Sequence, residues 1–368
     1  MRAMITAGVA LALLTASACG APDRDGGDGS GGDGDADGGD FSISAMLDQV
    51  PATDLEEYTV RIADVDAATE AAGLERPDDP GDEAATAQWL APLTGQRSQD
   101  GYAPIPLFLP ELTVRSTLNL AEFDDLAGWS LVDVASYADI PEAPGRFTVI
   151  AGDVDDDTLA HLPEVGDGVR TVGEGEDGRG DLSGRNAVQS TGAPVRMAQR
   201  DGQLAASDST AVVKDWLSGP SEPLTTDPTV DSLADALDEA GSVSALMSVG
   251  HDFSADSQPV SEQSFGPLPP SDFDAVALGW SADDDEPVVT IAYHFADEAA
   301  ASDSVESLRE VFEDGTDSRG TRLSDSLALG EITAQGPVVT ATLSTKEDGA
   351  HADLATRLRQ RDAPFVHG

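Results

Sequence analysis

Hydrophobic and polar residues alternate with a period of two in several short segments of the chain, and this alternation predicts β-strands. The clearest case is 288–295, where Val289, Ile291, Tyr293 and Phe295 share one face of the strand. The predicted strands are 58–62, 146–152, 195–199, 203–206, 242–249, 273–280, 288–295, 327–333 and 338–343.

Between these strands, apolar residues recur at helical spacing, and capping residues mark the helix ends. Asp227 and Pro228 mark the start of a helix at 230–240, and Gly315 ends a helix at 297–313. Residues 94–111 have no period and contain three prolines, which predicts an irregular crossing. The other predicted helices are 64–72, a short one at 84–90, two short turns within 123–134, and 155–162, 209–217 and 350–361.

The last hundred residues have the order strand, strand, helix, strand, strand, helix, which predicts an antiparallel sheet with helices packed on one face. The preceding residues show a similar mixture, so we predict an α+β fold made of two consecutive α+β bodies. Four prolines within 258–271 mark a linker between them. The predicted domains are therefore 41–257 and 272–368, and the sequence leaves open whether they are duplicates.

The N-terminus has the features of a bacterial export signal. Arg2 precedes an apolar segment at 7–14, which is followed by Ala16-Ser17-Ala18-Cys19. Small residues before a cysteine resemble the lipobox of bacterial lipoproteins. We therefore predict a signal peptide at 1–18 and a lipidated Cys19, which would anchor the protein to the outer face of the cell membrane.

An ordinary secretory signal cut near Ala18, with Cys19 as a free thiol, is the alternative to lipidation. In either case residues 19–40 consist mainly of glycine and aspartate. Such a segment cannot bury enough apolar surface to offset its chain entropy, so we predict a disordered tether between the membrane and the folded body.

Acidic residues dominate the composition, with 69 Asp and Glu against 20 Lys and Arg and a formal net charge of −49. This charge repels phosphates, which argues against a nucleic-acid partner. Many aspartates with only two lysines are typical of proteins that stay soluble in concentrated salt, where charge repulsion is screened. Capture of cations at the cell surface is the alternative explanation.

Candidate catalytic residues are few. The five histidines lack zinc-ligand spacing, and one cysteine forms no thiolate cluster, so we predict no metal site and no cofactor. His294 and Asp297 form a candidate polar site. With Ser302 they suggest a hydrolase triad, but the chain has no Gly-x-Ser-x-Gly elbow around that serine.

Three further motifs are expected to be chance matches. Segment 33–38 mimics the first half of a calcium loop but has Ser44 at the twelfth position. Segment 153–157 has Glu164 at that position, but Thr158 replaces the glycine that the turn requires. Arg179-Gly180-Asp181 lies in a loop at 173–185 that we predict to be exposed.

Several strand-to-helix joins carry a family resemblance. They are Gly128-Trp129-Ser130-Leu131-Val132-Asp133-Val134, the segment 147–155, Ser232-Leu233-Ala234-Asp235, and the segment 293–300. Over about residues 45–365 the chain resembles uncharacterised secreted lipoproteins of actinobacteria. The resemblance implies that the protein is exported as a lipoprotein and comes from a bacterium. It implies no activity and no functional residues.

Together these features lead to one functional hypothesis and two alternatives. The hypothesis is a non-catalytic, lipid-anchored surface protein whose α+β body binds a cell-wall polymer, another ligand or a protein partner. The first alternative is an extracytoplasmic hydrolase with a site around His294 and Asp297. The second is a cation-binding surface protein.

Overall fold

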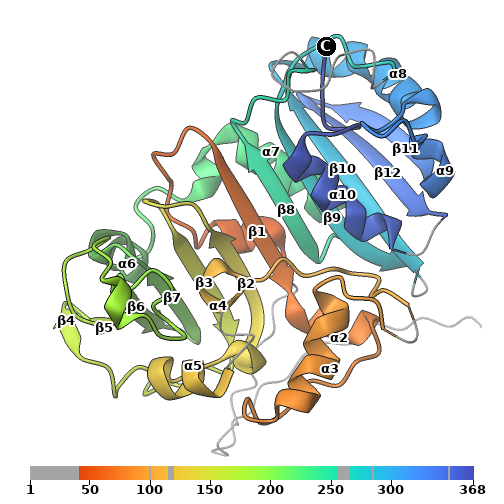
Figure 1. Ribbon diagram of the computed structural model, residues 1–368. Helices are drawn as coiled ribbons and strands as arrows, with labels where there is room; N and C mark the ends of the chain where they lie inside the picture. The colour runs from red at the N-terminus through yellow and green to blue at the C-terminus, as the bar shows by residue number, and fades with distance from the viewer. Residues whose placement is uncertain (1–40, 99–100, 115–119, 256–265, 284–285, 347–348) are drawn as a thin grey trace, which may run out of the picture. The chain divides into compact units, whose positions relative to one another are not determined.

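Antiparallel pairing of twelve strands builds one continuous sheet in the described part of the chain (Figure 1). This computed structural model describes residues 41–98, 101–114, 120–255, 266–283, 286–346 and 349–368. The sheet order is β11-β12-β10-β9-β8-β1-β2-β3-β7-β6-β5-β4. The strands are β1 (Tyr58–Asp64), β2 (Val134–Ile140), β3 (Phe147–Gly152), β4 (Glu164–Gly166), β5 (Val169–Val172), β6 (Val195–Arg200), β7 (Gln203–Ser207), β8 (Ser244–Val249), β9 (Phe273–Asp283), β10 (Glu286–Phe295), β11 (Leu327–Gln335) and β12 (Val338–Thr345).

The predicted signal peptide at 1–18, the lipidated Cys19 and the tether at 19–40 all lie outside the described residues. None of the helices within the described ranges has both the length and the apolar character that a membrane span requires.

The two predicted α+β bodies meet in the middle of the sheet. The last strand of 41–257 is β8, and it pairs with β9 from Ser244 opposite Trp280 to Val249 opposite Ala275. Residues Phe41–Gly368 form one compact unit. Of the predicted linker at 258–271, only 266–271 are among the described residues. The two bodies therefore share a single sheet.

The helices begin where the sequence offers caps. Asp64, Ser209, Asp227 and Asp297 each accept a backbone N–H bond at the start of the following helix. The α-helices are α1 (Ile43–Leu47), α2 (Val65–Ala71), α3 (Glu83–Leu93), α4 (Glu111–Val114), α5 (Leu120–Ala127), α6 (Thr210–Leu217), α7 (Pro228–Glu239), α8 (Glu298–Asp314), α9 (Leu323–Ser326) and α10 (Ala350–Gln360).

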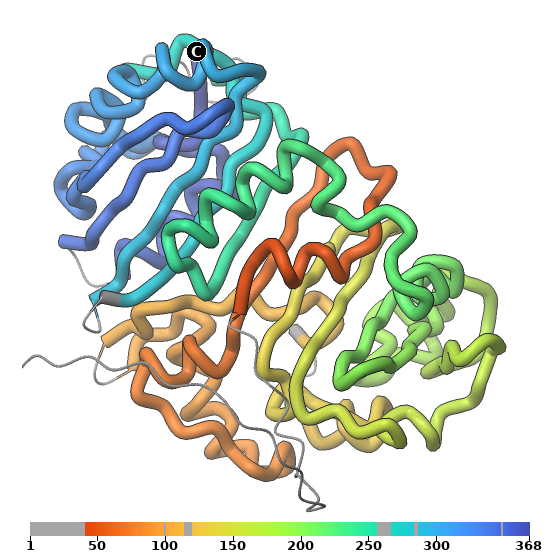
Figure 2. The backbone as a smooth tube through the Cα atoms, turned by 180° about the vertical axis from the view of Figure 1, so that it is seen from behind, coloured from red at the N-terminus to blue at the C-terminus, as the bar shows by residue number. Residues whose placement is uncertain are grey.

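One face of the sheet is covered by α1, α6 and α7 (Figure 2). Helix α7 buries Val230, Leu233 and Leu237. It packs against β8, β9, β10 and β12. Gly279 on β9 permits the close approach, since a Cβ atom there would lie 2.1 Å from Ser242 Oγ and 2.8 Å from Leu237 Cδ2.

The opposite face carries the larger core, under α2, α3, α5 and α10 (Figure 1). Trp89 of α3 is buried there and donates from Nε1 to Thr69 Oγ1 of α2 at 3.0 Å. Trp280 of β9 donates from Nε1 to His351 O of α10 at 3.1 Å. The first hydrogen bond holds α3 to α2, and the second holds α10 to β9. Helices α3 and α10 flank the groove described below.

The predicted α+β class with antiparallel strands is confirmed. In the last hundred residues α8 and α10 pack on the same face of the sheet, as predicted. In the sheet as a whole helices cover both faces, because β8, β9 and β10 bury side chains on each side. The predicted strands all occur, several of them longer than expected. Elements α1, α4, α9, β2, β4 and β5 were not predicted, the strands β4 and β5 because they are too short to show a period.

One predicted helix is wrong. Residues 155–162 form a series of turns, with bonds such as Thr158 N to Asp155 O. Gln199 explains this, because its amide oxygen accepts from Leu159 N at 2.8 Å and its Nε2 donates to Asp155 O at 2.8 Å. A helix would need both backbone groups for its own ladder.

Candidate functional site

A groove of about 1200 Å³ opens on the face of the sheet that carries α3 and α10. Its floor includes Thr59 and Arg61 of β1 and Leu246 of β8. One wall is α3 and another is α10. A third is the strap, which we define as residues 101–110, the irregular crossing that the prolines predicted (Figure 1). The volume exceeds what a typical drug-sized ligand occupies.

Side chains from the sheet and α10 hold the strap by its backbone carbonyl groups. Because these bonds come from rigid elements, the strap forms a fixed wall of the groove although it has no regular secondary structure. The three bonds are Arg61 Nη1 to Leu109 O at 2.9 Å, Ser244 Oγ to Pro106 O at 2.7 Å, and His351 Nε2 to Ala103 O at 2.8 Å.

Arg61 is the charged residue of the groove floor. Its Nη1 lies 3.7 Å from Glu111 Oε2 and 3.6 Å from Asp139 Oδ2, and its side chain is 23% exposed. The guanidinium therefore lies between two carboxylates and also supports the strap. Arg61 is therefore a partly exposed cation whose charge is already balanced by Glu111 and Asp139.

Asp139 lies beneath the floor and is completely buried. Its Oδ1 accepts from Thr148 Oγ1 at 2.6 Å, and its Oδ2 accepts from Glu111 N at 3.1 Å. Burial raises the pKa of this carboxyl to about 6, although Arg61 and the two hydrogen bonds favour its charged form. Asp139 thus joins the start of α4, which follows the strap, to β2.

Two polar atoms lining the groove have no hydrogen-bond partner among the described residues. They are Thr86 Oγ1 on α3 and Oε2 of Glu142, which follows β2. Thr86 is only 5% exposed. Both atoms have almost no exposed surface. A buried polar group without a partner costs about 1–3 kcal/mol, so a ligand or water that reaches either atom recovers that cost.

His294 and Asp297, the candidate polar site, are not paired with each other. His294 Nδ1 lies 2.7 Å from Asp274 Oδ1, whereas Asp297 caps α8 by accepting from Ala300 N at 2.9 Å. His294 lies on the face of β10 that packs against α7, as Ala292 does. Ser302 is exposed on α8. The groove opens on the opposite face of the sheet.

Two further histidines pair with carboxylates near the start of β9. His251 Nδ1 lies 3.1 Å from Glu57 Oε2, and His367 Nδ1 lies 3.1 Å from Asp272 Oδ1. Phe273 packs edge-on against His367 at 4.9 Å between ring centroids. Within the described residues, no three His, Cys, Asp or Glu side chains are arranged to hold a metal ion.

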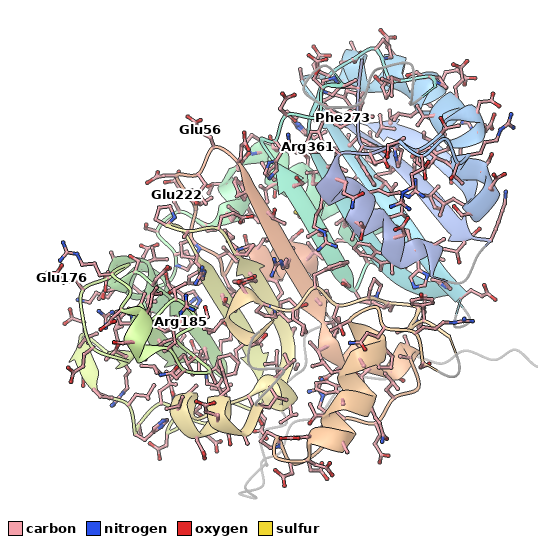
Figure 3. The ribbon with its side chains drawn as sticks, in the orientation of Figure 1. Glu56, Glu176, Arg185, Glu222, Phe273 and Arg361 are labelled. Atoms are coloured by element: carbon pink, nitrogen blue, oxygen red, sulfur yellow. The ribbon has the colours of Figure 1, made fainter. Side chains whose placement is uncertain are left out.

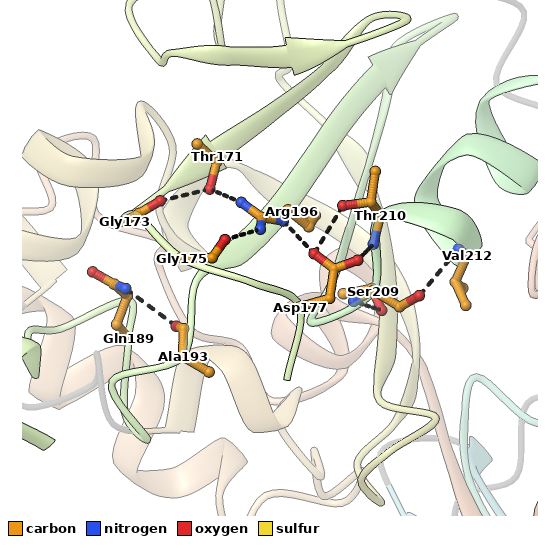
Figure 4. A network of polar contacts seen from close by, with 11 residues as sticks. Thr171, Gly173, Gly175, Asp177, Gln189, Ala193, Arg196, Ser209, Thr210 and Val212 are labelled. Carbon is orange, nitrogen blue, oxygen red and sulfur yellow. Dashed lines mark hydrogen bonds and ion pairs between the residues drawn. The ribbon is translucent and has the colours of Figure 1, made fainter. Parts of the chain in front are cut away.

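The loop at 173–185 is tied to the body by the buried Arg196 (Figure 4). Its guanidinium donates to Asp177 Oδ1 at 2.8 Å, Gly175 O at 2.8 Å and Thr171 Oγ1 at 2.6 Å. Asp177 Oδ2 in turn accepts from Thr210 N at the start of α6. The loop is exposed, as predicted, and Arg196 of β6 holds it against the folded body.

The second calcium-like segment directly follows β3. Its residues 153–157 form bends and turns, and Glu164 begins β4. The first calcium-like segment, 33–38, lies outside the described residues.

Carboxylates project from several loops, among them those that carry Glu56, Glu176 and Glu222 (Figure 3). Glu56 and Glu222 are exposed before β1 and before α7, and Glu176 is exposed in the loop that follows β5. With 69 acidic and 20 basic side chains, most carboxylates have no basic partner to pair with. Their mutual repulsion opposes the compact state.

The sequence analysis missed the residues that shape the groove. Arg61 gave one signal, since it is a basic residue within a half-buried strand of a chain that has few basic residues. Thr86, Glu111, Asp139 and Glu142 gave none, because threonine and acids are common throughout this chain.

Comparison with known proteins finds a solved structure of limited similarity. No family model matches the chain, and no curated protein matches it. A solved structure described as "Structure of crystal form I of TP0453" is similar to it at 11% sequence identity with a TM-score of 0.37. The similarity covers 86% of this chain and 97% of that chain.

Proposed function

We propose that this protein is a lipid-anchored surface protein whose folded body binds a ligand in the groove between α3, α10 and the strap. The single observation that carries the binding role is the nearly buried hydroxyl of Thr86, which lines this large groove without a partner among the described residues. The lipid anchor rests on the lipobox-like sequence that ends at Cys19.

Apolar and polar side chains share the groove in a way that suits binding. Leu90, Leu109 and Leu246 offer apolar surface, while Arg61 and Glu142 offer polar groups that fix orientation. Apolar contact supplies affinity, and a few placed polar groups supply specificity. The strap and the two flanking helices are held by hydrogen bonds, so little ordering is required on binding.

Filling the groove should prevent binding of an apolar probe. Ala91 lines the groove on α3, and we expect Ala91→Trp to weaken binding of the neutral dye Nile red about tenfold, because the indole occupies ligand space. The dye's fluorescence, titrated against the folded protein, measures this.

Ala84→Trp is the matched control, since Ala84 is exposed on the same helix and does not line the groove. Equal dye affinity in wild type and Ala91→Trp would contradict the groove as the binding site. Equal losses in both variants would indicate an effect on α3 itself.

Replacing the lipidated residue should release the protein. In a bacterium that processes lipoproteins, we expect Cys19→Ser to move nearly all of the protein from the membrane fraction to the medium, because the acyl chains supply the membrane affinity. Cell fractionation and the intact mass of the mature protein measure this. Ser30→Ala in the same segment is the control, and a Cys19→Ser protein that still sediments with membranes would rule out lipid anchoring.

A further inference from the structure

We propose that the groove selects ligands in which a positively charged amine is attached to an apolar body. The proposal rests on the proposed function, because it names the ligand class for the same groove. It follows from the balance of charges in the groove and from one carboxylate oxygen that the fold leaves unpaired.

The charged residues of the groove are mostly acidic. Among the described residues, its lining contains four carboxylates and two guanidiniums, Glu83, Glu111, Glu142 and Asp353 against Arg61 and Arg359, and Asp139 adds a further carboxyl beneath the floor. Asp353 is itself paired with Arg357, whose Nε lies 2.9 Å from Asp353 Oδ2. Arg61 lies between Glu111 and Asp139, so its charge is compensated more than once. Near neutral pH the described lining is therefore net negative, and it repels an anionic group.

Glu142 provides the most direct acceptor for a cation. Its Oε2 is buried and has no hydrogen-bond partner among the described residues, although the residue lines the groove. Glu142 as a whole is only half-buried, so its carboxylate can pair with a cation in the groove. An ammonium group carries three donors and one positive charge, so this pairing reduces the negative charge of the lining. Within the described residues, no Arg or Lys forms an ion pair with Glu142.

The same groove also offers apolar surface for the rest of the ligand. Leu90 on α3, Leu107 and Phe108 on the strap, and Leu120 on α5 line the same groove. The net charge of −49 also attracts cations to the protein as a whole. A cation without an apolar body gains only that general attraction, so the combination of the two features distinguishes the ligand.

Three probes of equal chain length separate these contributions: octylamine, octanol and octanoate. By calorimetric titration in about 0.15 M NaCl, we expect octylamine to bind about tenfold more tightly than octanol, and octanoate to bind more weakly than octanol. Propylamine, which carries the charge on a short chain, should bind at least about tenfold more weakly than octylamine because it buries little apolar area.

Glu142→Gln tests the acceptor. We expect it to weaken octylamine binding about fivefold to tenfold and to leave octanol binding unchanged, because it removes the charge and keeps the shape. Glu174→Gln is the matched control, since it makes the same change of charge at an exposed loop position outside the groove.

The outcomes separate this proposal from the proposed function. If octanoate binds as tightly as octylamine, or if Glu174→Gln lowers octylamine affinity as much as Glu142→Gln does, the preference for amines is wrong while the groove remains a binding site. If none of the three probes binds and Nile red also fails to bind, the proposed function is wrong.

Discussion

Raising NaCl from about 0.1 to about 1 M is expected to raise the melting temperature of the folded body by about 10 °C. The physical reason is screening, since the Debye length falls from about 10 Å to about 3 Å over this range. Charges that repel one another across loops no longer do so at the higher concentration. The rise should be steepest at the low end, where the Debye length changes most.

The structure explains why the effect should be large. Exposed acids such as Glu56, Glu176 and Glu222 lie on loops far apart in the sequence (Figure 3). The two lysines and few arginines cannot compensate them. Each repulsion is small, but their sum matters because the free energy of unfolding of ordinary proteins is only about 5–15 kcal/mol.

A melting series in NaCl and CaCl2, matched for ionic strength, measures the effect and tests its origin. A general screening effect gives similar rises in both salts, and KCl serves as a control for NaCl. Melting temperatures that do not change with NaCl would contradict the screening explanation. A jump in calcium alone would favour specific cation binding, because a ligand that binds only the folded state adds its binding free energy to stability.

Asp139→Asn is expected to remove a pH dependence of stability that the wild type shows between about pH 4 and pH 7. Burial raises the pKa of Asp139 from its ordinary 3.8 to about 6 in the folded state. Between these values the folded protein binds the proton more tightly than the unfolded chain does. The free energy of unfolding therefore falls as pH rises through this window, by about 3 kcal/mol for this residue.

Urea unfolding of wild type and Asp139→Asn across this pH range, in high salt, measures the effect. The free energy of unfolding of the variant, minus that of the wild type, should increase by about 3 kcal/mol from pH 4 to pH 7. Thr148 Oγ1 can still donate to the amide oxygen of the variant, whereas Glu111 N loses its acceptor. That loss does not depend on pH, so the change with pH tests the assignment. Asp303→Asn, on the exposed side of α8, is the reference for the loss of one carboxylate. Parallel pH profiles for wild type and Asp139→Asn would contradict the assignment.

The sequence alone determined most individual elements. In β10 the alternation placed Val289, Ile291, Tyr293 and Phe295 on one face, and all four are buried in the same core. Asp227 was predicted to cap α7, and its side chain does so. Periodicity and capping depend on neighbours within a few residues, so they can be recognised without the rest of the chain.

The arrangement of those elements depends on contacts that the sequence pattern does not contain. The pattern separated 41–257 from 272–368, but pairing of β8 with β9 joins them in one sheet. Residues 155–162 do not form the predicted helix. Gln199, forty residues away from Leu159, forms hydrogen bonds with Leu159 N and Asp155 O, which the helix would need. In the first case both strands were predicted, but neither strand's own pattern indicates which strand it pairs with. In the second, a distant side chain satisfies backbone groups that a local helix would have used.

The groove was decided by tertiary structure alone. The sequence indicated only that 94–111 would cross irregularly, and it singled out His294 and Asp297, which the fold places apart from the groove. Arg61, Glu111 and Asp139 come from β1, from the start of α4 and from β2. They meet only when β1 pairs with β2 and the strap brings α4 across the sheet. Acids are so frequent in this chain that their positions in the sequence carry little information. Their burial and their partners, which only the folded chain supplies, distinguish the few that shape a site from the many that keep the surface charged.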